Sequence, residues 1–177
     1  MFFLSEDSVL KHKEYLKDLK LKYSVIEKSY PLVKGTDLKT LLSSRLPSNV
    51  RSEAAALKSK IILHELYFDS FSDKFFICDA ARKYYGSEAN FLYEIEREIL
   101  KSEEYGFLLV FCDNKKRLRF EFSDDFCEIL ANASPILSLD LWEHAYFSDF
   151  GFDRKRYVKL ALSHLNLSKI NDFYKIY

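Results

Sequence analysis

The sequence contains few of the residues that interrupt helices or form tight turns, with four glycines and three prolines among 177 residues. Folds built mostly from short strands and turns need many more of both, so this scarcity favours a helix-rich chain over an all-β one. The chain is long enough for one hydrophobic core or for two small, closely packed lobes.

The chain also lacks a net charge, because 27 Lys and Arg residues balance 27 Asp and Glu residues. Without a basic excess, nothing in the composition favours nucleic acid or an acidic membrane surface, and we expect neither as a partner. No apolar run is long enough to span a membrane, and the segment from Met1 to Asp7 lacks the basic and apolar regions of a secretory signal.

The three cysteines, Cys78, Cys112 and Cys127, do not suggest a disulfide framework, because their number is odd. Their spacing also differs from that of cysteine metal sites. We interpret them as reduced thiols, and the sequence therefore predicts a cytoplasmic protein.

Two long helices are predicted in the N-terminal half, the first from near Ser5 to before Pro31 and the second from about Ser52 to Phe71. A short helix over 37–42 and a loop over 43–48 connect them. Apolar residues recur every three or four positions in both, which predicts one buried stripe on each helix. The stripes consist of Val9, His12, Leu16, Leu19, Tyr23 and Ile26, and of Leu57, Ile61, His64, Phe68 and Phe71.

Strands are predicted only in the C-terminal half, over 106–112, 118–122 and 135–139, and they form a small antiparallel sheet. Ser87 can cap the helix that follows it, which carries Phe91, Leu92, Ile95 and Ile99. Helices over 153–165 and 167–173 close the chain. The predicted fold class is therefore α+β, with a long antiparallel α-hairpin over 1–80 and an α/β lobe with a three-stranded antiparallel sheet over 81–177.

Four residues could hold a metal ion. Asp140 ends a predicted strand and His144 follows four residues later, so a helical turn places both on one side of the chain. The alternative is a helix start in which Asp140 is the cap and Glu143 completes a capping box. A hairpin brings His12 and His64 together, and although a single buried histidine is usually an ordinary core residue, two of them beside an Asp/His pair suggest a shared metal.

A resemblance supports the metal interpretation. The segment from Ser134 to Phe147 reads Ser-Pro-Ile-Leu-Ser-Leu-Asp-Leu-Trp-Glu-His-Ala-Tyr-Phe and resembles the C-terminal signature of the iron/manganese superoxide dismutases, Asp-x-Trp-Glu-His-x-Tyr. The segments 153–158, 163–166, 5–12 and 63–68 are also similar to segments of that family. The resemblance implies that His12, His64, Asp140 and His144 bind one Fe or Mn ion, without choosing between the two, although the ligand types alone also suit Zn.

The resemblance also implies roles for residues around the metal. Trp142 and Phe68 are expected to be apolar walls, and Glu143 is expected to hydrogen-bond His144 of a partner subunit in a homodimer. Where the family has a His and a Tyr lining the substrate funnel, this chain has Leu16 and Lys20.

The chain departs from the family at two further positions. Phe147 replaces a Tyr, and either Asp125 or Phe126 occupies the position of a Gln or His that lies close to the metal. Lys20 and Tyr23 are the candidates to replace the missing polar groups, Lys20 as a cation that attracts superoxide.

The sequence therefore favours a cytoplasmic, homodimeric Fe- or Mn-dependent superoxide dismutase, an antioxidant enzyme that converts superoxide to oxygen and hydrogen peroxide. The alternative is a metal-binding homodimer of the same fold with little or no dismutase activity. A third possibility is an α/β interaction domain in which the histidines are core residues and no metal is bound.

Overall fold

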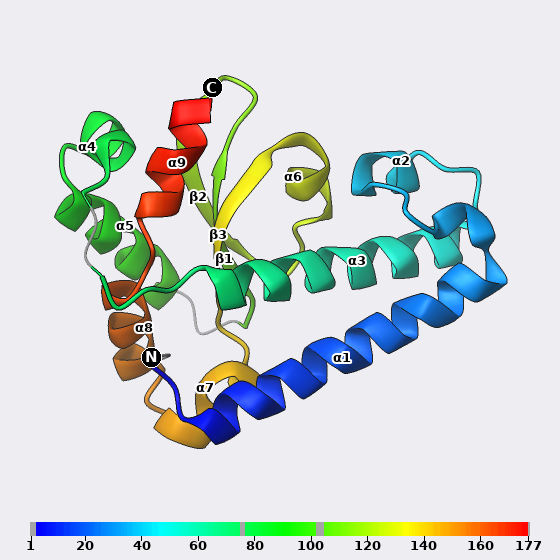
Figure 1. The fold of residues 1–177 in the computed structure, drawn as a ribbon, viewed down its shortest axis with the longest axis horizontal. Helices are drawn as coiled ribbons and strands as arrows, with labels where there is room; N and C mark the ends of the chain where they lie inside the picture. The colour runs from blue at the N-terminus through cyan, green and yellow to red at the C-terminus, as the bar shows by residue number, and fades with distance from the viewer. Residues whose placement is uncertain (1–2, 75–76, 102–104, 177) are drawn as a thin grey trace.

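The computed structural model describes residues 3–74, 77–101 and 105–176. Its two longest helices, α1 (Glu6–Ser29) and α3 (Ser48–Asp69), form an antiparallel hairpin along one side of the molecule (Figure 1). The connection between them contains the 3-10 helix η1 (Pro31–Val33) and the short helix α2 (Leu38–Leu42). The predicted hairpin and the predicted short helix are therefore confirmed.

Helix α1 begins where the sequence predicts. The Ser5 hydroxyl accepts a hydrogen bond from the backbone N–H of Ser8, and Glu6 and Asp7 lie in the first turn, where carboxylates interact favourably with the helix dipole. Every residue of the predicted stripe is buried or half-buried, whereas apolar residues on the other side, such as Leu10 and Leu21, are exposed.

Helix α3 begins at Ser48, about four residues before the predicted start, and ends at Asp69, two residues before the predicted end. The predicted loop over 43–48 is therefore wrong at its last residue. Pro47 is the N-cap residue, and a proline directly before a helix is compatible with a helix start because the first N–H groups need no helical partner.

Helix α3 lies between α1 and the sheet (Figure 1), so it buries more than the single predicted stripe. Its fully buried residues are Ala54, Ala55, Ser59, Leu63, His64 and Tyr67. Of the predicted stripe, only His64 is fully buried, and the others are half-buried.

The sheet has the predicted three antiparallel strands, β1 (Phe107–Cys112), β2 (Leu118–Ser123) and β3 (Ser134–Asp140), in the order β2-β1-β3. All six residues of β1 are buried because it is the central strand. Its first residue, Phe107, pairs with Asp140 at the end of β3. This register places Asp140 at the edge of the sheet that faces the hairpin.

The described part of the C-terminal half also contains six helices: α4 (Asp79–Tyr85), α5 (Glu88–Leu100), α6 (Cys127–Asn132), α7 (Glu143–Phe150), α8 (Arg154–Ser163) and α9 (Ser168–Ile176). Helix α5 has the predicted Ser87 cap, and α8 and α9 agree with the predicted closing helices. Helices α4 and α6 were not predicted, because six or seven residues are too few to give a helical periodicity. No helix in the described ranges has the length and apolar composition needed to cross a membrane.

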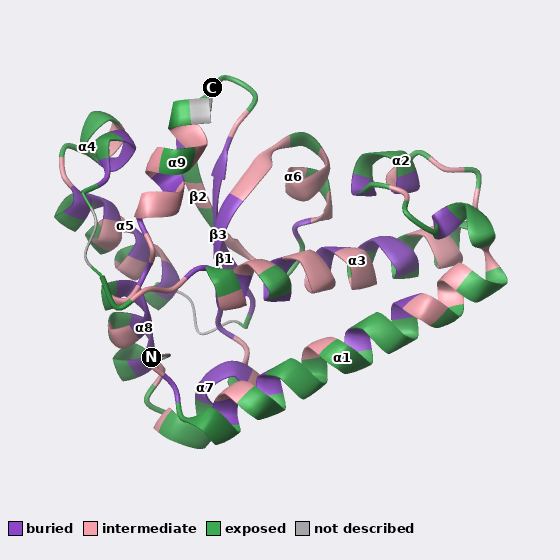
Figure 2. Ribbon diagram, viewed as in Figure 1, coloured by how far each residue is buried: buried purple, intermediate pink, exposed green. Residues whose placement is uncertain are grey.

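The buried residues form a core that includes both halves of the chain (Figure 2). The largest cluster contains Leu4, which precedes α1, and Tyr67 from α3, together with residues of the sheet and of α5, α7 and α8. A second cluster around Leu41 lies at the far end of the hairpin, and a third, around Phe107, lies between α3 and the sheet. The division of the chain at residue 80 stays a prediction.

Gly106 precedes β1 at a point where two backbone segments come close together. A Cβ atom added there would lie 2.4 Å from the carbonyl oxygen of Ser123, a backbone atom that cannot move without disturbing β2. We expect Gly106→Ala to lower the free energy of unfolding by about 1–3 kcal/mol, the usual cost of overpacking. Urea unfolding measures this, with Tyr93→Ala on the exposed surface of α5 as control. Equal stability of the two variants would show that the strands can separate freely here.

Candidate metal centre

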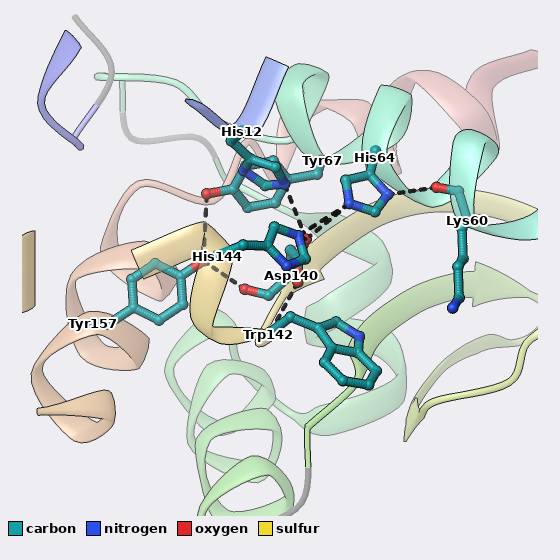
Figure 3. Close-up of polar contacts among 8 residues, drawn as sticks. All are labelled: His12, Lys60, His64, Tyr67, Asp140, Trp142, His144 and Tyr157. Atoms are coloured by element: carbon teal, nitrogen blue, oxygen red, sulfur yellow. Dashed lines mark hydrogen bonds and ion pairs between the residues drawn. The ribbon is translucent and has the colours of Figure 1, made fainter. Parts of the chain in front are cut away.

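Four side chains from four elements converge on one point (Figure 3), and they are the four that the sequence predicts to lie together. His12 comes from α1, His64 from α3, Asp140 from the end of β3 and His144 from the first turn of α7. One potential ligand atom from each lies within 4.8 Å of the other three.

The distances among these atoms agree with a common metal ion. Asp140 Oδ2 lies 3.0 Å from His12 Nε2, 3.3 Å from His64 Nε2 and 3.0 Å from His144 Nε2. Ligand atoms each about 2.1 Å from one ion, at angles of about 90–120°, are about 3.0–3.6 Å apart. The donor set therefore fits a metal ion by geometry.

The hydrogen bond of His64 gives an independent reason for a cation. Its Nδ1 lies 2.6 Å from the carbonyl oxygen of Lys60, which can only accept, so Nδ1 carries the proton. In a neutral ring, Nε2 then presents a lone pair, and it faces Asp140 Oδ2 and, at 3.3 Å, Nε2 of His144. A lone pair directed at a carboxylate oxygen is repulsive unless a cation lies between them.

The Asp140 carboxylate is held in a fixed orientation. Its Oδ1 accepts a hydrogen bond from the backbone N–H of Trp142 at 2.9 Å, which leaves Oδ2 directed at the histidines. The Tyr157 hydroxyl donates to the Asp140 carbonyl at 2.6 Å and lies 3.3 Å from the Tyr67 hydroxyl. The alternative in which Asp140 caps a helix is wrong, because β3 extends through Asp140 and the N-cap residue of α7 is Trp142, which makes no capping hydrogen bond.

Burial and hydrogen bonding move the pKa values of the site in directions that suit metal binding. Burial lowers the pKa of His64 to about 4, so the ring is neutral at pH 7. Burial alone would raise the pKa of Asp140, but hydrogen bonds from His12 and His144 hold it well below its usual range. The centre therefore offers a carboxylate and at least one neutral imidazole without any change of pH.

Aromatic rings surround the centre on the side that faces the interior of the protein. Phe68 and Tyr67 contact His12, with ring centroids 4.9 and 4.7 Å away, and Phe107 meets His64 edge to face at 5.1 Å. On the side of the sheet, Phe126 is fully buried in the same cluster as Phe107 and Trp142. These rings exclude water and lower the local dielectric constant, which strengthens electrostatic interactions at the site.

Two of the other predicted site residues, Trp142 and Glu143, are adjacent to the centre. Trp142 precedes α7 and stacks on Tyr105 with ring centroids 5.7 Å apart. Glu143 is exposed, and its carboxylate accepts a hydrogen bond from the Tyr105 hydroxyl at 2.7 Å within the same chain.

The structure does not bring Lys20, Tyr23 or Asp125 to the centre. Lys20 Nζ forms an ion pair with Glu65 Oε1 at 2.7 Å, on the exposed side of the hairpin. Tyr23 is buried in the cluster at the far end of the hairpin, eleven residues and thus about 16 Å along α1 from His12. Asp125 is exposed and accepts a hydrogen bond from the N–H of Cys127 at 2.9 Å. Of the two alternatives at 125–126, Phe126 is the one on the inner side.

Sequence reasoning missed Tyr15, which lies beside the centre. Its ring stacks on His144 with centroids 4.2 Å apart and lies 5.3 Å from the ring of His64. Burial and the negative charge of Asp140 raise the pKa of its hydroxyl. The available signal was its position three residues after His12, which is about one helical turn.

Comparisons with known proteins agree on one family. The model of the iron/manganese superoxide dismutases, C-terminal domain, matches residues 74–173, which is more than half of the chain. An iron superoxide dismutase of Cupriavidus metallidurans is 26% identical over 125 residues, covering 67% of this chain and 64% of that protein. Superoxide dismutase [Mn] 1 of Halobacterium salinarum is 32% identical over 132 residues, covering 67% and 66%. The chain thus spans about two thirds of the length of these relatives.

The depressed pKa of His64 predicts acid sensitivity of the protein once metal has been removed by a chelator. Between the ordinary pKa of 6.5 and the folded value of about 4, the unfolded chain binds a proton that the folded chain does not. The free energy of unfolding therefore falls as the pH is lowered through this range, by about 3 kcal/mol in total for this group. The depressed pKa of Asp140 adds a further loss below its ordinary value of 3.8.

Urea unfolding in the presence of EDTA at pH 7, 5.5 and 4.5 measures this effect. His64→Gln should flatten the dependence, whereas His164→Gln, away from the centre, should leave it unchanged. If wild type and His64→Gln have parallel pH profiles, another group is responsible for the acid sensitivity.

Proposed function

Because the chain belongs to the iron/manganese superoxide dismutase family, we propose that it converts two superoxide anions and two protons into oxygen and hydrogen peroxide. The reaction takes place at one Fe or Mn ion held by His12, His64, Asp140 and His144. The observation that carries the proposal is the convergence of three imidazole nitrogens on one buried carboxylate oxygen.

The bound ion would supply one-electron redox chemistry, taking an electron from one superoxide and giving it to the next. The residues of the chain hold and insulate it. Asp140 compensates part of the positive charge of the ion, and the hydrogen bond from His64 to Lys60 fixes the orientation of that ring. Phe68 and Phe107 exclude water from the inner side, and protons reach the centre from the side of His144, the partly exposed ligand.

The alternative proposal is a metal-binding protein of the same fold with little dismutase activity, and two features favour it. On the side of the sheet, Phe107 contacts His64, and Phe126 is buried in the same cluster as Phe107; neither side chain can form a hydrogen bond. Lys20, the proposed steering cation, is paired with Glu65, which offsets its charge. Metal binding and dismutase activity are therefore tested separately.

We also propose that the protein is a cytoplasmic homodimer. The exposed rings of Phe147 and Phe152 meet edge to face at 5.2 Å, and they form an apolar surface next to Glu143 on α7. Burying this surface against a second copy would remove apolar area from water. The cysteines Cys78, Cys112 and Cys127 are free thiols, which suits a reducing compartment.

Metal content tests the first part of the proposal. Protein expressed with ample Fe or Mn should contain about one ion per chain by elemental analysis. Asp140→Asn should lose most of it, because the amide removes the negative charge that the ion needs, whereas Asp172→Asn on exposed α9 should retain it. A wild-type protein with no more metal than Asp140→Asn would contradict the ligand set.

Superoxide decay after pulse radiolysis then decides between the two functions. The Fe-loaded and Mn-loaded proteins are measured separately, and we expect at least one form to accelerate the decay catalytically. Full metal content in both forms, with decay no faster than in the Asp140→Asn protein, would favour the metal-binding alternative.

The dimer proposal predicts that Glu143→Ala weakens both association and metal retention, because Glu143 would hydrogen-bond His144 of the second subunit. Tyr105→Phe is the matched control, since it removes the hydrogen bond within the chain but leaves the Glu143 carboxylate in place. Analytical ultracentrifugation and elemental analysis measure the two effects. A wild-type protein that sediments as a monomer with full metal content would show that the bridge does not exist.

A further inference from the structure

The four residues of the centre differ in their access to solvent. The side chains of His12, His64 and Asp140 are at most 1% exposed, whereas that of His144 is 27% exposed. A metal ion or a small anion can therefore reach the centre with the least rearrangement by passing His144.

The ring of Tyr15 covers this opening. It stacks on His144 with an interplanar angle of 28° and lies next to His64. Tyr15 also lines a surface pocket of about 500 Å³, together with His144, Glu14, Asp18 and Glu143. The rings of Tyr15 and His144 thus separate the pocket from the centre. Of these two residues, His144 is a candidate ligand and Tyr15 is not.

We propose that Tyr15 is the gate of the metal centre, whose ring must turn aside before an ion or a small anion passes between the pocket and the ligands. This inference rests on the proposed function only in that the four residues bind a metal. Tyr15 is 37% exposed, so its ring can change rotamer into solvent without unpacking the core. Two other rings at the centre, those of Tyr67 and Phe107, are fully buried and cannot move in this way.

The ring, and not the hydroxyl, performs the gating. The contacts that hold Tyr15 over the centre are ring contacts with His144 and His64. A phenylalanine can make the same contacts, whereas an alanine leaves the opening uncovered.

The charges at the pocket favour cations over anions. Glu14, Asp18 and Glu143 contribute three carboxylates to its lining, against one ammonium from Lys11, which is paired with Asp7 at 2.6 Å. Divalent metal ions are therefore attracted toward the gate and anions are repelled. Glu14 and Asp18 lie on α1, so this asymmetry does not depend on whether Glu143 pairs with a partner subunit.

Two exchange rates test the gate, and neither requires superoxide. The first is the rate at which Mn²⁺ is transferred from the loaded protein to excess EDTA. The second is the rate at which azide binds to the Fe³⁺-loaded protein, measured by the change in the visible absorption of the protein. We expect Tyr15→Ala to increase both rates several-fold, Tyr15→Phe to leave both at the wild-type level, and Tyr93→Ala, a remote exposed tyrosine on α5, to change neither. Raising the salt concentration should accelerate azide binding, because it screens the carboxylates.

Wild-type rates in Tyr15→Ala would overturn the proposal, and so would equal acceleration in Tyr15→Ala and Tyr15→Phe. Should Tyr15→Ala fold poorly, Tyr15→Leu takes its place, because leucine keeps the helix but not the flat ring. Mn²⁺ release that has the same rate and temperature dependence as global unfolding in every variant would show that the ion leaves by separation of the hairpin from the sheet, which also contradicts a gate. If the protein binds metal but does not remove superoxide, the proposed function is wrong, and the two exchange rates still test the gate.

Discussion

The structure depends on one buried carboxylate. Asp140 is completely inaccessible to solvent, and transferring an isolated carboxylate into such a place costs far more than the stability of a typical domain. Hydrogen bonds from Trp142 and from the histidines offset part of this cost. The lone pair of His64 Nε2, which faces the same oxygen, adds repulsion. A metal ion resolves both problems, because it neutralises the carboxylate and accepts the lone pair.

The fold can be understood as the means of bringing four elements to this carboxylate. The antiparallel pairing of β1 with β3 sets the position of Asp140 opposite Phe107, and the immediate start of α7 returns His144 to it. The hairpin supplies His12 and His64 from helices that are long enough to extend beyond the centre into a separate apolar cluster. Because the elements converge from different directions, loss of the ion would weaken the packing between the hairpin and the sheet.

Much of this arrangement could be predicted from the sequence, and the reasons are local. Asp140 and His144 are four positions apart at the junction of a strand and a helix, so their proximity requires no tertiary information. His12 and His64 each lie on an apolar helical stripe, and a hairpin is the simplest way to bury both stripes. The antiparallel sheet could be predicted from three short apolar segments, over 106–112, 118–122 and 135–139.

The residues around the metal were harder to predict because their positions depend on tertiary contacts. Tyr15 lies beside the apolar stripe of α1, and its ring contacts His144 from α7 and His64 from α3, which lie far from it in the sequence. The pairing of Lys20 with Glu65 depends on how α1 and α3 are aligned. The choice between Asp125 and Phe126 depends on the turn after β2, where Ser123 and Asp125 hydrogen-bond each other and direct Phe126 inward.

The central claim is that His12, His64, Asp140 and His144 hold one ion, and anomalous diffraction at the absorption edge of the metal tests it most directly. Crystals of protein loaded with Fe or Mn should show one anomalous peak per chain, about 2.0–2.2 Å from each of the four ligand atoms. A peak elsewhere, or none between these four side chains in protein that carries metal in solution, would contradict the account.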